Sequence, residues 1–306
     1  MAIKYRLLFF LICFSISCLA QGSNLDKEII VDNQKRHFII HLPTGFEGMT
    51  KLPVILALHG SGGDSKMASR HYNMNGLADA NRFIVVYPDA LNKLWNLNWS
   101  TYHNNGLPDD YKFISTVLDE LSAHYKADSN RIFCTGISRG GVFSLLLGWQ
   151  LSNRIRGIAP LCASIPNGIK NEWTFTHSLS ILLINGTEDP LINYQGGAGK
   201  VSLPYSGGQA INMMATEELV QKILTLNNCP SKPIIKNLPD IDPKDGCVAT
   251  DYEYNCNGVG VEFIKITGGG HTWPGGYQYE SSSMIGNLCK DFSASEKIFE
   301  FFKSIK

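Results

Sequence analysis

Short apolar runs alternate with longer stretches of helical period along this chain of 306 residues. Each run is rich in β-branched and aliphatic side chains and is followed by turn-forming residues, a pattern that predicts strands. Several runs are apolar throughout, which is typical of strands covered on both faces in a parallel sheet. The predicted strands are 38–42, 54–59, 83–88, 131–136, 157–162, 181–185 and 261–267.

The stretches between these strands carry apolar residues at intervals of three and four, which predicts amphipathic helices. Phe113, Val117 and Leu121, for example, fall on one helical face. Strand followed by helix, repeated, favours an α/β fold with a mostly parallel, doubly wound sheet and helices on both faces. The predicted helices are 66–81, 109–126, 139–151, 209–227 and 293–305.

Two stretches, 196–208 and 230–246, depart from this alternation because glycine or proline and aspartate dominate them. Neither separates two segments that could each form a complete core, so we interpret both as loops or insertions within one domain. We therefore expect a single α/β domain over residues 21–306.

Residues 1–20 have the pattern of a secretory signal peptide. Lys4 and Arg6 precede the apolar run 7–14, and Ala20 precedes a polar segment. The run is shorter than the roughly 20 apolar residues that span a bilayer. We predict soluble export to the extracellular space or periplasm. Lipoprotein anchoring at Cys18 is the alternative, although Ser15 stands where an aliphatic residue would be expected.

The charge balance excludes some classes of partner. The chain has 27 Lys and Arg against 27 Asp and Glu, and 44% of its residues are hydrophobic. This apolar content can bury a large core and excludes a disordered chain. Without net charge or a basic stretch, the protein has no positively charged segment that would attract nucleic acid or an anionic membrane. We expect neither partner, no membrane span, and a monomer.

Six cysteines remain after the predicted signal peptide, an even number that suggests disulfides in an exported chain. Cys134 and Cys162 lie in apolar runs, where a buried free thiol is at least as well supported as a bridge. Cys229, Cys247 and Cys256 fall in the polar stretch 227–260, and among them we favour a Cys229–Cys256 bond. No CxxC spacing or Cys/His cluster indicates a metal site, so we expect no cofactor.

The strongest chemical signal is a Gly-x-Ser-x-Gly segment centred on Ser138, between an apolar strand and a helix. A serine on such a turn exposes its Oγ and lies at a helix N-terminus, where backbone N–H groups can meet developing negative charge. Glycines at 136 and 140 let neighbouring backbone pass close to it. We predict that Ser138 is a nucleophile, with an ordinary glycine-rich turn as the alternative.

A second apolar strand runs into His59-Gly60-Ser61-Gly62-Gly63. The glycines allow this loop to fold under the nucleophile and direct a backbone N–H into the site, as an acyl-transfer oxyanion requires. We predict that the N–H groups of Ser61 and Arg139 form the oxyanion hole. His59 is interpreted as a structural residue that orders the loop.

His271 is the predicted general base. It follows the strand 261–267 and lies between paired glycines, which we expect to give it a mobile, solvent-reaching loop. An imidazole, with an ordinary pKa of about 6.5, can accept and return a proton near neutrality. No other histidine follows a strand near the C-terminus, so surface or packing roles are expected for the rest.

Asp189 is the predicted orienting acid, because it lies just past the strand 181–185 and gives the chain order Ser, acid, His. A carboxylate at that place would hold the imidazole tautomer and stabilise the imidazolium. Glu188 is the fallback. Further alternatives lie in a loop with solvated surroundings: Asp240, Asp242 and Asp245.

Several segments together resemble the polyhydroxybutyrate depolymerase-like branch of carbohydrate esterase family 1, in the α/β-hydrolase superfamily. The Gly-His-Thr-Trp-Pro-Gly stretch around His271 is the most specific of them. The similarity covers about residues 30–306. The segments are 56–64, 85–89, 109–114, 135–141, 185–190 and 269–276.

This branch contains secreted feruloyl esterases and acetyl xylan esterases. The resemblance implies an α/β-hydrolase fold and a triad of Ser138, Asp189 and His271, and Cys229 and Cys256 match positions where the family often carries cysteines. It also implies a secreted serine carboxylic ester hydrolase that removes feruloyl or acetyl groups from plant cell-wall polysaccharide through an acyl-enzyme. The expected partner is an ester-substituted polysaccharide or oligosaccharide, or a small aromatic or acyl ester.

Arg139 departs from the family, which more often has a small or amide side chain after the nucleophile. Its guanidinium could meet an acidic group on the substrate, but pairing with a neighbouring carboxylate is the favoured interpretation. Flat aromatic side chains could contact a phenolic acyl group or a sugar. We select Trp273, Trp99 and Tyr194 as substrate-binding candidates, with core packing as the alternative for each.

Two other functions remain open at this point. One is a depolymerase of polyhydroxyalkanoates, which differs only in the acyl group. The other is a catalytically silent carbohydrate-binding protein. The intact triad argues against this second function, since a binding module has no physical need for a strained serine turn.

Overall fold

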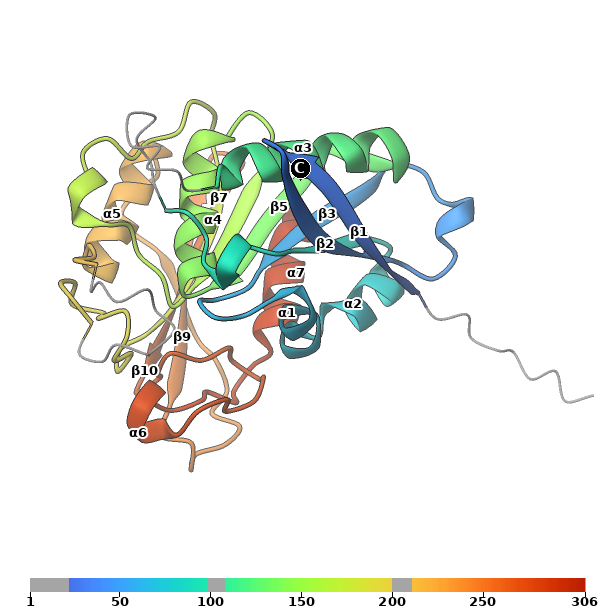
Figure 1. Cartoon of the computed structure of the whole chain (residues 1–306). Helices are drawn as coiled ribbons and strands as arrows, with labels where there is room; N and C mark the ends of the chain where they lie inside the picture. The colour runs from blue at the N-terminus through green and yellow to red at the C-terminus, as the bar shows by residue number, and fades with distance from the viewer. Residues whose placement is uncertain (1–21, 98–107, 200–210, 306) are drawn as a thin grey trace, which may run out of the picture.

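The computed structural model describes residues 22–97, 108–199 and 211–305. The predicted signal peptide and Trp99 lie outside these described residues. Within them, ten strands form one sheet in the order β1-β2-β4-β3-β5-β6-β7-β10-β9-β8 (Figure 1). The strands are β1 Ser23–Val31, β2 Gln34–Leu42, β3 Leu52–Leu58, β4 Ile84–Pro88, β5 Ala127–Ile137, β6 Gly157–Leu161, β7 Ser180–Gly186, β8 Ile234–Asn237, β9 Val248–Cys256 and β10 Val259–Thr267.

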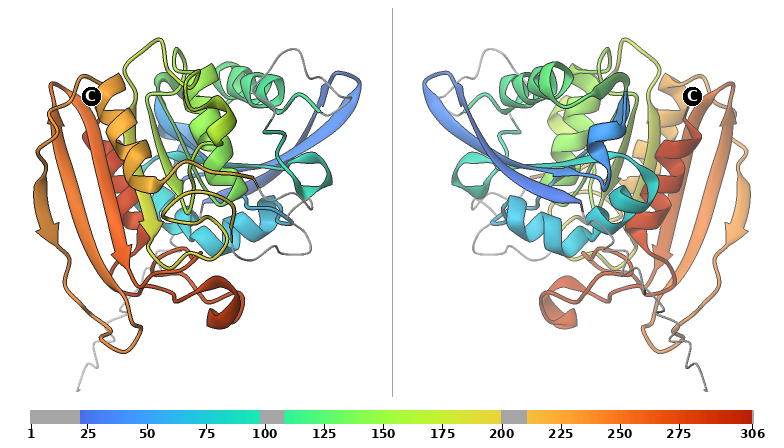
Figure 2. Two further views of the ribbon diagram at one scale, coloured as in Figure 1. Left: turned by 90° about the vertical axis from the view of Figure 1, so that its left-hand side faces the viewer. Right: turned by 90° about the vertical axis from the view of Figure 1, so that its right-hand side faces the viewer.

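The centre of the sheet is parallel and its edges are antiparallel. Each neighbouring pair from β4 to β10 runs parallel, while β1, β2, β9 and β8 join with reversed direction. Figure 2 shows β10, β9 and β8 side by side at one edge and the long ribbon of β1 and β2 at the other. All seven predicted strands are present, and the predicted α/β fold is confirmed.

Alternate residues of the central strands enter two separate cores, which explains their continuous apolar runs. Leu56 of β3 packs in one cluster and its neighbours Ile55 and Ala57 in the other. One face is covered by helices α3 Asp110–His124, α4 Arg139–Gln150 and α5 Thr216–Leu226. The opposite face is covered by α1 Ser65–Tyr72, α2 Met74–Asn81 and α7 Ala294–Ser304.

The predicted helix 66–81 is in fact two helices. Asn73 has a φ of 50°, in the left-handed region, and ends α1 before α2 begins. Asparagine tolerates this conformation better than most residues because its short amide can bond locally. A short helix, α6 Ser282–Ile285, was not predicted.

The antiparallel edge strands β1, β8 and β9 were also not predicted. All four residues of β8 are exposed, and most of β1 alternates between exposed and half-buried positions, so neither is apolar over its whole length as a central strand is. The predicted Cys229–Cys256 disulfide is confirmed and ties the end of β9 to the residues after α5. The other described cysteines, Cys134, Cys162, Cys247 and Cys289, carry free thiols.

The parallel strands end at one edge of the sheet, and three predicted site residues follow from this. Ser138 comes directly after β5, Asp189 shortly after β7, and His271 shortly after β10. Ligand sites of open α/β sheets lie outside the carboxyl ends of the strands. Among the helices of the described ranges, none combines the length and hydropathy that a bilayer crossing requires.

Candidate active site

Ser138 occupies a strained turn between β5 and α4. Its φ is 59° and its ψ is −128°, a combination that residues with a side chain rarely adopt. The turn is fixed on both sides, because the N–H of Ser138 donates to the carbonyl of Leu161 at 3.0 Å and its carbonyl accepts from Val142 at 2.8 Å. This conformation presents the side chain to a pocket at the carboxyl edge of the sheet.

Two glycines permit this turn, as the sequence predicts. A Cβ added to Gly140 would lie 2.5 Å from the carbonyl oxygens of Leu58 and His59. A Cβ added to Gly136 would lie 2.8 Å from the backbone of Gly140. Strand β3 therefore passes against the start of α4 with no room for a side chain.

The side chains of Asp189 and His271 form a buried pair. His271 Nδ1 lies 2.7 Å from Asp189 Oδ2, and both side chains are 2% exposed. The other carboxylate oxygen of Asp189 accepts the N–H groups of Leu191 and Ile192, each at 2.8 Å. Because every oxygen of Asp189 is engaged, the carboxylate has one orientation, and it selects the His271 tautomer with a proton on Nδ1.

The loop that carries His271 differs from the predicted one. His271 is buried rather than solvent-reaching, and its N–H donates to Ile285 at 2.5 Å. The N–H of Gly270 donates to Asn287, and a Cβ at Gly270 would lie 2.2 Å from the Ile285 carbonyl. The glycines thus allow close backbone packing, and the expectation of a solvent-reaching loop was wrong.

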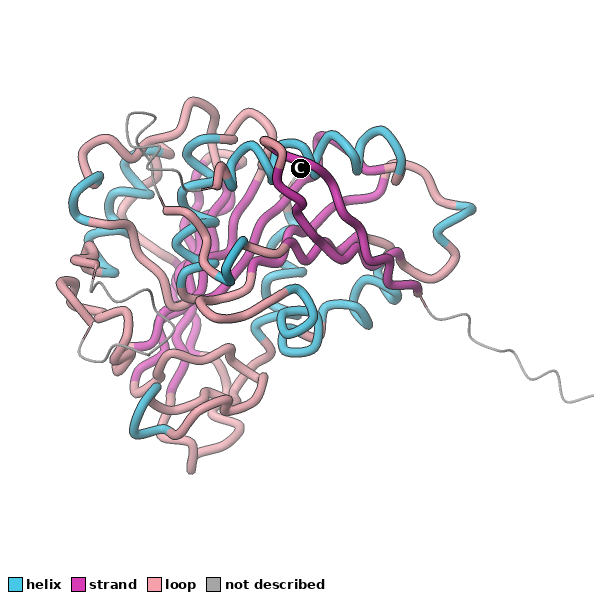
Figure 3. Tube along the Cα trace, viewed as in Figure 1, coloured by secondary structure: helices cyan, strands magenta, loops and turns pink. Residues whose placement is uncertain are grey.

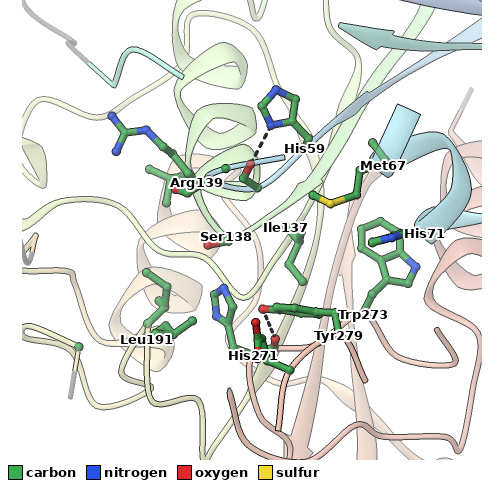
Figure 4. A pocket seen from close by; sticks show the side chains of 18 of the residues that line it. His59, Met67, His71, Ile137, Ser138, Arg139, Leu191, His271, Trp273 and Tyr279 are labelled. Carbon is green, nitrogen blue, oxygen red and sulfur yellow. Dashed lines mark hydrogen bonds between the residues drawn. The ribbon is translucent and has the colours of Figure 1, made fainter. Parts of the chain in front are cut away.

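Ser138 and His271 line the same pocket, but they do not form a hydrogen bond to each other in the part of the chain that the structure describes. In Figure 4 both side chains face one hollow, with Leu191 on one side and Met67 and Ile137 on the other. Nucleophile–base contacts are often loose in the absence of substrate and tighten when it binds.

The predicted oxyanion residues border the same pocket. Ser61 and Arg139 both line it, and neither backbone N–H donates a hydrogen bond to another described residue. Arg139 is at the first position of α4, where a backbone N–H has no acceptor within the helix. Two such groups beside a serine can stabilise an oxyanion.

His59 orders the oxyanion loop, in agreement with its structural interpretation. Its Nδ1 lies 2.7 Å from the carbonyl of Gly60, and its Nε2 accepts the N–H of Ala90 at 3.1 Å. The indole of Trp95 packs on its ring and donates to the His59 carbonyl at 2.8 Å. Burial lowers the pKa of His59, so the ring is neutral near pH 7.

The Arg139 side chain does not pair with a carboxylate, contrary to the favoured interpretation. Its Nε donates to the carbonyl of Trp95 at 2.6 Å, and no ion pair joins it to another described residue. The buried Asp110 nearby is already paired with Arg36. Arg139 lines the pocket, but Figure 4 shows its guanidinium directed away from Ser138 and His271.

The pocket has a volume of about 460 Å³ and a mostly apolar wall. Its walls come from segments far apart in the chain: the His59 loop, α1, the start of α4, residues 191–199 and 211–213, and the His271 loop. A cavity of this size accepts a small acyl or aromatic group.

Of the predicted substrate-binding aromatics, Trp273 lines the pocket. It stacks on Tyr72 with ring centroids 4.0 Å apart and planes at 10°, and its indole N–H donates to Ser295. Tyr194 does not line it. That residue packs in the core, its hydroxyl donates to Glu217 at 3.0 Å, and Lys265 lies over its ring.

The alternative acids lie elsewhere. Glu188 is exposed, and its N–H donates to Gly269, so it braces the loop while its side chain points to solvent. The three other candidates, Asp240, Asp242 and Asp245, lie near Lys290 and Asp291, away from the pocket lining.

The sequence interpretation missed three residues at the site: His71, Tyr277 and Cys162. His71 on α1 and Tyr277, six residues past His271, line the pocket and bond to each other through the tyrosine hydroxyl. Cys162 lies behind the buried pair, and its thiol is 3.4 Å from the carbonyl of Thr272. The aromatic residue after the paired glycines could have indicated Tyr277, whereas no local signal distinguishes His71 or Cys162.

Comparison with known proteins finds similarity to esterases. Residues 31–156 match the family described as "Putative esterase". A "Putative esterase NocK" of Nocardia uniformis is 26% identical over 92% of this chain and 83% of its own length. A "Probable feruloyl esterase C" of Aspergillus terreus is 25% identical over 88% of this chain and 91% of its own length.

Two further proteins are similar to this chain. The bifunctional acetylxylan esterase/xylanase XynS20E of Neocallimastix patriciarum is 27% identical over 72% of this chain, which spans 29% of that longer protein. The solved acetyl xylan esterase from Aspergillus awamori superposes with a TM-score of 0.60 at 14% identity, over 92% of this chain and 100% of its own. At that identity, the structural likeness shows a common fold.

The fold and the sequence relatives define the class of protein. The chain has the α/β-hydrolase fold and is a serine carboxylic ester hydrolase. Within this superfamily, the family match and the relatives support the feruloyl esterase branch, as the sequence resemblance implied.

Proposed function

We propose that Ser138 is the nucleophile of this esterase, His271 its general base and Asp189 the acid that orients the base. The observation that carries the proposal is the 2.7 Å bond between the buried Asp189 and His271, beside a serine held on a strained turn in the same pocket. The N–H groups of Ser61 and Arg139, which donate to no acceptor in the described part of the chain, support their role as oxyanion donors.

In this mechanism His271 Nε2 removes the proton from Ser138 as its Oγ attacks the ester carbonyl. The resulting oxyanion is stabilised by the N–H groups of Ser61 and Arg139, while Asp189 stabilises the imidazolium. The protonated His271 then donates to the leaving alcohol and leaves an acyl-serine. A water activated by the same histidine releases the acid and restores the serine.

The substrate that we propose is a feruloyl or acetyl ester on plant cell-wall polysaccharide such as xylan. The support is the names of the relatives, which include feruloyl esterases and an acetylxylan esterase. The apolar wall of the pocket, with Met67, Ile137 and Trp273, can pack against the acyl part of such an ester.

We further propose that residues 1–20 direct export and that residues 21–306 form one catalytic domain. The support for a single domain is the one sheet that runs through all described segments. A cell-wall polysaccharide is too large to enter a cell, so a substrate of this class requires the enzyme outside it.

The test is a side-by-side assay of methyl ferulate, acetylated xylan and an oligomer of hydroxybutyrate, with wild type and Ser138→Ala. We expect release of ferulate or acetate by wild type and loss of at least about 10⁴-fold in kcat for the variant. A fluorophosphonate probe should label wild type alone. Full activity or labelling of Ser138→Ala would overturn the mechanism, and hydrolysis of the hydroxybutyrate oligomer alone would overturn the substrate.

A further inference from the structure

Two free thiols that the mechanism does not use lie together outside the pocket. Cys247 precedes β9 and Cys289 follows α6, and they are 3% and 0% exposed. Their sulfur atoms and a carboxylate oxygen of Asp245 all lie within 4.8 Å of one another. The sulfurs of a disulfide lie about 2.05 Å apart. The two thiols are therefore neighbours that are not bonded in this structure.

The two cysteines border a loop-rich part of the molecule. Figure 3 shows that the chain around α6, beyond the ends of β9 and β10, is mostly loop. Polar contacts hold this part: Lys290 bonds to Asp242 and Asp245. The N–H of Ile241 bonds to Asp291 at 2.9 Å. The two Lys290 contacts are exposed, and contacts of that kind contribute little stability.

The segment that ends at Cys289 supports the His271 loop. Ile285 accepts the N–H of His271, Asn287 accepts that of Gly270, and Cys289 accepts that of Gly275 at 2.9 Å. A covalent bond at Cys289 therefore restrains the segment 285–289, which positions the proposed general base. Its partner Cys247 leads directly into β9, which is fixed by its pairing with β10.

We propose that Cys247 and Cys289 are a second cross-link site, at which a disulfide forms and holds the His271 loop on the edge of the sheet. The oxidant is a disulfide such as glutathione disulfide or an oxidised thiol oxidoreductase. One cysteine thiolate attacks it and forms a mixed disulfide, and the other cysteine displaces the second thiol. Two thiols of the protein are oxidised, and one disulfide of the oxidant is reduced to two thiols.

The cross-link has a direct chemical test that does not depend on the proposed esterase function. The full chain is refolded in a glutathione redox buffer, and its thiols are titrated in denaturant. If the bond forms, Cys247→Ser frees Cys289 and raises the count by one relative to wild type. If it does not, the same variant lowers the count by one. Cys134→Ser, a matched buried cysteine away from the pair, lowers the count by one in either case.

Peptide mass spectrometry of the wild type tests the same point without any variant. A linked pair of peptides containing Cys247 and Cys289 supports the cross-link, and two separately alkylated peptides overturn it. One equivalent of bound zinc that is lost in Cys247→Ser also overturns it, because the cluster with Asp245 would then be a metal site.

The consequence for the His271 loop is measured by thermal inactivation with p-nitrophenyl acetate as substrate. The double variant Cys247→Ser/Cys289→Ser should inactivate at a temperature lower by about 5 °C than oxidised wild type. Reductant should lower the wild-type value further than that of the double variant, since both share the Cys229–Cys256 bond. If reductant lowers the inactivation temperature of both proteins equally, the cross-link does not support the His271 loop.

Discussion

The thiol of Cys162 donates to the carbonyl of Thr272, the residue that follows the proposed base, with sulfur and oxygen 3.4 Å apart. The same thiol lies 3.8 Å from the carbonyl of Gly270, on the other side of His271. Cys162 directly follows β6 and is buried, so it joins the end of the central sheet to both backbone neighbours of the proposed base.

Cys162→Ala should therefore lower kcat without a comparable change in KM. Loss of a weak buried hydrogen bond amounts to about 0.5–1.5 kcal/mol, or roughly 2- to 13-fold in rate. Cys134→Ala is the control, because that thiol is equally buried but lies within β5. If both variants lower kcat equally, Cys162 has no positioning role.

Asp189→Asn should reduce kcat by about 10⁴-fold, because an amide cannot stabilise the imidazolium and can favour the wrong tautomer. The fold should persist, since the amide oxygen can still accept from Leu191 and Ile192. Glu188→Gln is the matched control and should keep wild-type kinetics, because that side chain is exposed. Steady-state assays with a p-nitrophenyl ester measure both, and a loss of similar size in Glu188→Gln would contradict the assignment of the acid.

Ser138→Gly should be more stable than Ser138→Ala by about 1 kcal/mol. The φ of 59° and ψ of −128° strain any residue with a Cβ, and glycine adopts them freely. Both variants lack the hydroxyl and should be inactive, so urea denaturation compares them without a difference in function. Equal midpoints and slopes would mean that the turn stores no strain.

Gly140→Ala should destabilise the protein by about 2–3 kcal/mol, because its Cβ would meet the backbone of β3 at 2.5 Å. The variant should also lose activity, since the adjustment displaces the nucleophile turn. Gly76→Ala in α2 should have the opposite effect on stability. No atom lies within 4 Å of its added Cβ, so the higher helix propensity of alanine should stabilise the protein by about 0.5–1 kcal/mol.

Stability should fall on acidification through the protonation of His59. Burial lowers its pKa in the folded state, so below about pH 6.5 the unfolded chain binds a proton that the folded protein does not. The free energy of unfolding therefore decreases as pH falls, by up to about 1.4 kcal/mol per pH unit. His59→Gln lacks this proton and should show a weaker dependence between pH 7 and 5 in urea denaturation. Parallel pH curves would exclude His59 as the cause.

The predicted and observed elements agree where the local sequence carries the whole signal. Strand β3 has a continuous apolar run because its alternate residues, such as Ile55 and Leu56, enter opposite cores. Strand β8 has no such continuous run, because it is an exposed edge strand that pairs with β9. A pattern of burial cannot predict a strand that is not buried.

The His271 loop shows where local interpretation fails. Paired glycines are compatible both with mobility and with close backbone contact, and the choice depends on what lies next to them. The carbonyls of Ile285 and Asn287 occupy that place and bond to His271 and Gly270. Nothing within the loop itself indicates this neighbour.

The sequence by itself determined the parallel sheet, the serine turn and the order of Ser138, Asp189 and His271, because periodicity and short motifs depend on residues close together in the chain. Tertiary structure alone decided that Asp189 and His271, 82 residues apart, bond to each other. It also decided that Tyr194 is in the core while His71 reaches the pocket, and that Cys247 meets Cys289. These contacts arise from the packing of whole elements, which a local pattern does not encode.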